Sequence, residues 1–117
     1  MQKSTSDRLR GTLDALILTA LSNGALHGYG ISRWLAGRSG RALRVEEGTL
    51  YPALYRLERL GSIDAEWGMS ELGRRARFYR LTAAGDAQLA VEVRTFAEFI
   101  AVVSPILLPH ATMSQSA

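Results

Sequence analysis

The chain has 117 residues, 47% of them hydrophobic and 21% charged, which fits one soluble globular domain rather than a disordered chain. It contains no cysteine, which excludes a disulfide framework, a thiolate zinc site and a cysteine nucleophile and suits a cytoplasmic protein. The amino terminus lacks the apolar core of a secretion signal. The apolar stretch 96–109 is too short and too interrupted to span a bilayer.

The positive charge is concentrated in the first 85 residues. They carry thirteen basic and eight acidic side chains, a net charge of +5, whereas residues 86–117 carry a net charge of −2. Every basic side chain except Lys3 is an arginine, which can contact phosphate and guanine with two hydrogen bonds. Composition alone leaves two interpretations open: a solvated arginine-rich surface, or a nucleic-acid-binding surface.

Apolar residues at helical spacing predict two helices in the first forty positions. The first helix is expected over 9–21, and its apolar stripe is formed by Leu9, Leu13, Leu16, Ile17, Ala20 and Leu21. Asn23 and Gly24 end it. The second helix is expected over about 28–38, where one face carries Tyr29, Ile31, Trp34 and Leu35. We expect both tryptophans, Trp34 and Trp67, to lie in the core.

A third helix is predicted by leucines at spacings of four, three and three, which form an inward stripe of Leu50, Leu54, Leu57 and Leu60. Pro52 is tolerated only in the first turn of a helix, so the helix should begin near Glu47–Thr49 with an open amino terminus. Gly61 ends it. The opposite face then presents polar and aromatic side chains, namely Thr49, Pro52, Tyr55, Arg56 and Arg59, with Tyr51 at its margin.

The hydrophobic period changes to two after Gly61, which predicts a half-buried strand containing Ile63, Ala65 and Trp67. Residues 77–81 predict a second strand. The intervening segment contains two glycines and the adjacent Arg74 and Arg75, so we expect a β-hairpin with a long basic tip.

A last helix is predicted from Thr82, a good N-cap residue, to Ser104, where Pro105 should end it. Apolar residues step by four, three, four and three along it, as in a coiled-coil seam: Leu89, Val93, Phe96, Ile100 and Val103. So small a domain leaves little for this seam to pack on within one chain. We therefore interpret the helix as a dimer interface.

The element order is helix, helix, helix, strand, strand, helix, which is the order of a winged helix-turn-helix: mainly α with a small antiparallel β-hairpin. We expect an N-terminal extension over 1–8, a DNA-binding domain over 9–82, a dimerisation helix over 83–104 and a tail over 105–117. An open recognition helix suits the major groove, and a basic wing tip suits phosphates or the minor groove. The candidate DNA contacts are Thr49, Tyr51, Pro52, Tyr55, Arg56, Arg59, Arg74, Arg75 and Arg77.

Four stretches resemble motifs of the PadR family of bacterial transcription regulators, in particular its short-chain members. Residues 11–18 resemble the opening of the first helix, 26–31 the entry to the second, 47–58 the recognition helix, and 73–85 the wing and the step into the last helix. The resemblance implies a homodimer joined mainly through the last helix, bound to a roughly palindromic operator and usually acting as a repressor. It also implies that a small aromatic or hydrophobic effector could release the DNA. A last helix that ends at Pro105 would be short for the family.

No constellation of residues points to an enzyme, since two histidines, no cysteine and no paired carboxylates beside a nucleophile leave no candidate machinery. We expect no cofactor and no metal site, and we interpret His27 as a capping or core residue. The acidic residues near the recognition helix, including Glu58, are interpreted as solvated or salt-bridged. The main alternative is a winged-helix protein–protein interaction module that does not bind DNA directly.

Overall fold

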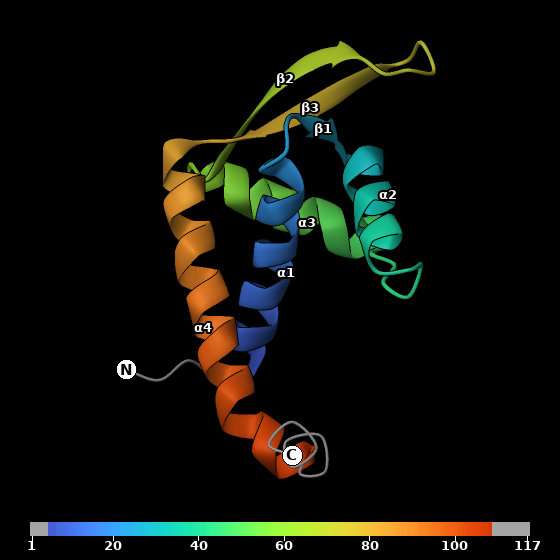
Figure 1. The fold of residues 1–117 in the computed structure, drawn as a ribbon. Helices are drawn as coiled ribbons and strands as arrows, with labels where there is room; N and C mark the ends of the chain where they lie inside the picture. The colour runs from blue at the N-terminus through green and yellow to red at the C-terminus, as the bar shows by residue number, and fades with distance from the viewer. Residues whose placement is uncertain (1–4, 109–117) are drawn as a thin grey trace.

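The computed structural model describes residues 5–108, with side chains from residue 11 onward. Four helices and three short strands make up the fold (Figure 1): α1 (Thr5–Leu21), β1 (Leu26–His27), α2 (Gly28–Arg38), α3 (Glu47–Arg59), β2 (Ile63–Met69), β3 (Arg75–Leu81) and α4 (Ala83–Leu107). The predicted winged helix-turn-helix is confirmed. The predicted bounds of α2 and α3 agree with the structure, whereas α1 begins four residues before the expected Leu9.

A three-stranded antiparallel sheet covers one end of the helices, in the order β1-β3-β2. The long strands pair from Ile63↔Leu81 to Met69↔Arg75, so the hairpin is longer than predicted and its tip is confined to residues 70–74. The sequence did not predict β1, which pairs Leu26 with Tyr79. A strand of two residues is too short to show a periodic pattern.

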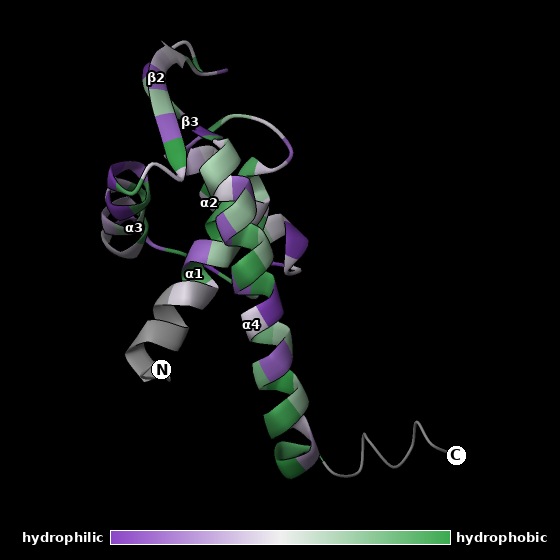
Figure 2. Cartoon of the chain, turned by 90° about the vertical axis from the view of Figure 1, so that its left-hand side faces the viewer, coloured by the Kyte–Doolittle hydropathy of each residue, from purple (hydrophilic) through white to green (hydrophobic). Residues whose placement is uncertain are grey.

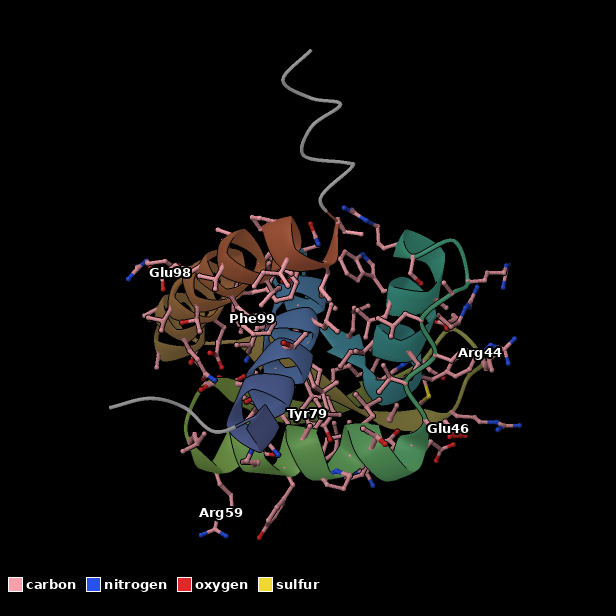
Figure 3. All side chains as sticks on the ribbon, turned by 90° about the horizontal axis from the view of Figure 1, so that it is seen from below. Arg44, Glu46, Arg59, Tyr79, Glu98 and Phe99 are labelled. Carbon is pink, nitrogen blue, oxygen red and sulfur yellow. The ribbon has the colours of Figure 1, made fainter. Side chains whose placement is uncertain are left out.

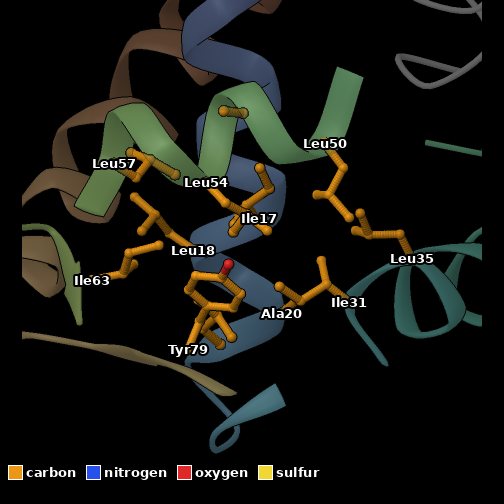
Figure 4. Packing of buried hydrophobic residues seen from close by; sticks show 12 residues of the cluster. Ile17, Leu18, Ala20, Ile31, Leu35, Leu50, Leu54, Leu57, Ile63 and Tyr79 are labelled. Atoms are coloured by element: carbon orange, nitrogen blue, oxygen red, sulfur yellow. The ribbon is translucent and has the colours of Figure 1, made fainter. Parts of the chain in front are cut away.

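The core forms around α1, which contributes buried residues toward α2, α3 and the sheet (Figure 4). Its buried members are Ile17, Leu18, Ala20, Leu21, Ile31, Leu35, Leu50, Ala53, Leu54, Leu57, Ile63 and Tyr79. The inward stripe predicted for α3 is correct for three leucines and wrong for Leu60, which is 64% exposed. Leu60 is the C-cap residue, so the backbone turns before its side chain reaches the core.

The start of α4 is fixed to the base of the hairpin. The Thr82 hydroxyl accepts a hydrogen bond from the Gly85 N–H over 3.0 Å, which confirms the predicted N-cap. The same hydroxyl donates to the Gly61 carbonyl over 2.6 Å. Gly85 is buried against the Ser62 carbonyl, and a Cβ at that position would overlap this oxygen. The contact leaves room only for glycine.

The prediction that α4 ends at Ser104–Pro105 is wrong, because the helix continues through Pro105 to Leu107. Proline removes a single N–H donor, and the Leu108 N–H still reaches the Ser104 carbonyl over 2.7 Å. The helix is consequently the longest in the fold, at 25 residues, rather than a short one. The rest of the expected tail, residues 109–117, lies outside the described residues.

Replacing Gly85 by alanine should lower the free energy of unfolding by about 3 kcal/mol, because its Cβ would force apart the start of α4 and the turn before β2. Gly37→Ala is the matched control: it is also a helical glycine, but a Cβ there meets open space. It should stabilise the protein by about 0.5–1 kcal/mol. Urea denaturation measures both, and equal midpoints for the two variants would show that the Gly85 contact does not constrain the fold.

Candidate nucleic-acid interface

The outer face of α3 is exposed along its length, because its leucines point into the core. Thr49, Tyr51, Pro52, Tyr55 and Arg59 all lie on the exposed side. The N-cap residue Glu46 makes no side-chain hydrogen bond to the helix, so the first-turn N–H groups are not capped by a side chain. A helix start of this kind can receive an anionic group.

Tyr55 and Arg59 form a pair one helical turn apart on this face. The Arg59 guanidinium carbon lies 5.7 Å from the centre of the Tyr55 ring. Tyr55 is 64% exposed, so its ring is not part of the core packing. Arg59 points away from the body of the molecule (Figure 3). Both side chains can reach a partner that approaches α3 from outside.

Tyr51 is placed by a close approach to the start of α2. A Cβ at Gly28 would collide with the Tyr51 hydroxyl, so the tyrosine can lie there only because residue 28 is glycine. Its ring remains partly exposed. Tyr51 therefore joins α2 to α3 and still presents its edge at the surface.

Arg56 faces α1 rather than the outside. Its guanidinium makes a salt bridge with Asp14, whose side chain is only 6% exposed. The Arg56 Nε is buried without a hydrogen-bond partner among residues 5–108. The structure thus gives Arg56 a part in fixing α3 against α1, and the predicted phosphate contact of this residue stays a prediction.

Arg77 links the wing to α3. Its guanidinium donates two hydrogen bonds to the Glu58 carboxylate, over 3.1 and 2.8 Å, in the parallel arrangement typical of arginine and carboxylate. The interpretation of Glu58 as a salt-bridged residue is confirmed. Burial raises the pKa of the neighbouring Tyr79 hydroxyl, and the Arg77 charge partly opposes that shift. Arg77 is therefore engaged within the domain in this structure.

The wing tip is a closed turn that carries two exposed arginines. The Ser70 N–H donates to the Arg74 carbonyl over 2.8 Å, and Gly73 adopts a left-handed φ of 74°. The Arg75 guanidinium lies over the ring of Trp67, 4.7 Å from its centre. Trp67 is 58% exposed, so its predicted place in the core is wrong. Trp67 lies in the part of β2 that extends beyond the residues covered by the helices.

A hollow of about 750 Å³ separates the wing from the starts of α2 and α3. The rings of Tyr29, Tyr51 and Trp67 and the side chains of Arg74 and Arg75 are among its lining. Tyr29 was predicted to lie with the apolar residues on one face of α2, but its side chain is 60% exposed. The helical period predicts which side of the helix a residue lies on, but it does not predict where the core stops. The first turn of α2 extends beyond the core.

His27 is the N-cap of α2, and its Nδ1 accepts a hydrogen bond from the Gly30 N–H over 2.8 Å. The interpretation as a capping or core residue is confirmed. Within residues 5–108, no group of three or more histidine, aspartate or glutamate side chains is arranged to hold a metal ion. In the same part of the chain, no helix has the length and apolar character needed to cross a membrane.

The seam predicted on α4 divides into two parts. Leu89 packs against the core, whereas Val93, Phe96 and Ile100 are exposed in the single chain and Val103 is half-buried. Figure 2 shows the distal part of α4 extending beyond the body as a largely hydrophobic rod. Further apolar side chains are exposed on it: Val91, Phe99, Val102, Ile106 and Leu107.

Three packed helices followed by a β-hairpin with a basic tip define the class of winged-helix proteins. The model of the transcriptional regulator PadR-like family matches residues 17–91. The chain belongs to this family of transcriptional regulators.

Two curated proteins are similar to the chain in sequence. An uncharacterised protein of Lysinibacillus sphaericus is 36% identical over 93 residues, which cover 80% of this chain and 85% of that protein. The transcriptional regulator Rv3488 of Mycobacterium tuberculosis is 38% identical over 82 residues, which cover 70% of this chain and 73% of that protein.

Solved structures have the same fold. A transcriptional regulator from Clostridium thermocellum superposes with a TM-score of 0.75 and 31% identity, over 84% of this chain and 95% of that one. A PadR family transcription regulator from Clostridium difficile gives a TM-score of 0.68 and 28% identity, over 81% of this chain and 97% of that one.

The salt bridge between Asp14 and Arg56 predicts the effect of one substitution. Asp14→Ala should lower the free energy of unfolding by about 3 kcal/mol, because it leaves a partly buried guanidinium without its counter-charge. Asp64→Ala is the matched control, since Asp64 pairs with Arg80 and both side chains are more than half exposed. It should cost less than about 1 kcal/mol. Equal losses in urea denaturation would contradict a special role for Asp14.

Proposed function

We propose that the protein is a sequence-specific DNA-binding transcription regulator that acts as a homodimer, as a repressor, on a roughly palindromic operator. One observation carries the DNA-binding part: Tyr51 of α3 and the exposed Arg74 and Arg75 of the wing border the same hollow. The recognition helix and the wing tip therefore face one side of the molecule. A single duplex can meet both.

On this proposal α3 lies in the major groove. Thr49 in its first turn, together with Pro52 and Tyr55 further along the helix, faces the base edges, and the uncapped N–H groups favour a phosphate beside them. Arg59 contacts the backbone at the other end of the helix. Arg74 and Arg75 reach phosphates or the adjoining minor groove from the wing. Arg56 and Arg77, which are paired inside the domain, hold this geometry.

The dimer part of the proposal is supported by α4. Monomeric proteins rarely expose a contiguous apolar patch of this kind, and the patch formed by Val93, Phe96 and Ile100 follows the spacing of a helix–helix seam. A two-fold axis along this seam presents two copies of α3 to the duplex. Half-sites should then lie about one helical turn apart, on the order of 10 bp, or a multiple of it.

Replacing both Arg74 and Arg75 by alanine should weaken binding to all DNA sequences and reduce the slope of log affinity against log salt by about 4, because the two subunits of the dimer together lose four phosphate contacts. Fluorescence anisotropy with the promoter region of the protein's own gene measures both quantities. Arg80→Ala is the control, because Arg80 lies on the same hairpin but is paired with Asp64 and Glu66.

The Arg80 variant should bind as the unmodified protein does. Unchanged affinity of the double variant at moderate salt would reject the wing assignment. Absence of any salt-sensitive DNA binding by the unmodified protein would reject the DNA-binding function itself and favour an interaction module.

Phe96→Glu should convert the dimer to monomers, because it places an unpaired charge in an apolar contact. Light scattering gives the mass directly. Ala90→Glu is the matched control on the same helix, since Ala90 is exposed and lies off the seam. A Phe96 variant that remains dimeric would place the interface elsewhere.

A further inference from the structure

The hollow under the wing results from the alternation of side chains along the hairpin. Ala65 and Tyr79 form a cross-strand pair that packs into the core. The next pair on the same face is Trp67 and Arg77, and it lies beyond the helices. Successive side chains of a strand point to opposite faces, so the face that packs on the core also lines the hollow further along the hairpin.

Aromatic rings form the walls of this space. Tyr29 is 60% exposed, Trp67 is similarly exposed, and Tyr51 shows its ring edge from the first turn of α3. The volume of about 750 Å³ falls in the range of small-molecule sites. Exposed rings around a concave surface are suited to stacking a planar group.

The lining of the hollow also carries positive charge that is not neutralised by an ion pair among the described residues. Arg77 is paired with Glu58, but Arg74 and Arg75 make no ion pair within residues 5–108. Arg75 presents a face of its guanidinium to Trp67, which leaves the N–H groups at its edge able to donate. Glu71 lies on the same lining, 3.8 Å from the Nε2 of His27, and supplies one acceptor carboxylate.

We propose that this hollow binds a free purine mononucleotide, with the base stacked on Trp67 or Tyr29 and the 5′-phosphate held by Arg74 and Arg75. Inorganic phosphate alone would leave the rings uncovered, and a neutral aromatic molecule would leave two guanidinium groups unpaired. Glu71 can accept a hydrogen bond from a ribose hydroxyl or a base amino group. A nucleotide satisfies all three kinds of group together.

The regulatory consequence rests on the proposed function. Tyr51, Arg74 and Arg75 border the hollow and are also assigned to the DNA interface. A nucleotide in the hollow and an operator on the wing would therefore compete for the same side chains. Binding of the nucleotide would release the DNA.

Fluorescence tests the site in the absence of DNA. Trp34→Phe leaves Trp67 as the only tryptophan of the chain. Titration with adenosine 5′-monophosphate should then change the Trp67 emission and saturate. Adenosine and inorganic phosphate should each bind at least about ten-fold more weakly, because each satisfies only part of the lining.

Two substitutions test the geometry in the same background. Tyr29→Ala and Arg74→Ala should each weaken binding of the monophosphate by about ten-fold. Arg38→Ala is the matched control, because Arg38 lies over Trp34 and not in the lining of the hollow. All three side chains are exposed, so the fold should tolerate the changes.

The outcomes separate this inference from the proposed function. If no saturable change occurs at millimolar monophosphate, if adenosine binds equally well, or if Arg38→Ala causes the same loss, the nucleotide site is rejected even where salt-sensitive operator binding persists. Saturable binding by a protein that ignores DNA would keep the site and reject the proposed function. Displacement of the operator fragment by the monophosphate supports the competition, and a ternary complex rejects it.

Discussion

The salt bridge between Asp14 and Arg56 fixes α3 against the central helix α1. A carboxylate that is almost fully buried in the central helix needs a counter-charge, since an unpaired charge there is expensive. α3 supplies this charge with Arg56, while its buried leucines leave Tyr55 and Arg59 on the outer face. The exposed face of α3, which we propose as the DNA-contacting surface, therefore lies on a helix that is fixed to α1 by this ion pair.

A second pair extends the constraint to the wing. Arg77 donates two hydrogen bonds to Glu58, so β3 contacts α3 directly through side chains, although β2 separates the two elements in the sequence. Two arginines that the sequence predicted as DNA contacts, Arg56 and Arg77, are thus also paired within the domain. The other three candidate arginines, Arg59, Arg74 and Arg75, lie on the exposed surface around these two ion pairs.

Local signals predicted most of the fold. The helical spacing of apolar residues placed α2, the N-cap threonine placed the start of α4, and the change of period at Gly61 located the hairpin. The failures have non-local causes. Leu60 and Trp67 follow the right periodicity but lie beyond the end of the core, and the partner of Arg56 is 42 positions away in the chain. Pro105 removes one N–H donor, yet the helix continues past it and the Leu108 N–H bonds the Ser104 carbonyl.

The hydrogen bond from the Thr82 hydroxyl to the Gly61 carbonyl fixes the start of α4 at the base of the hairpin. If α4 pairs with its copy in a dimer, this fixed junction ties the direction of the wing to the direction of α4. The angle at which two subunits cross would then fix the span between their wing tips. A small tilt at the distal end of this long helix would then change the distance between the two wing tips along the duplex.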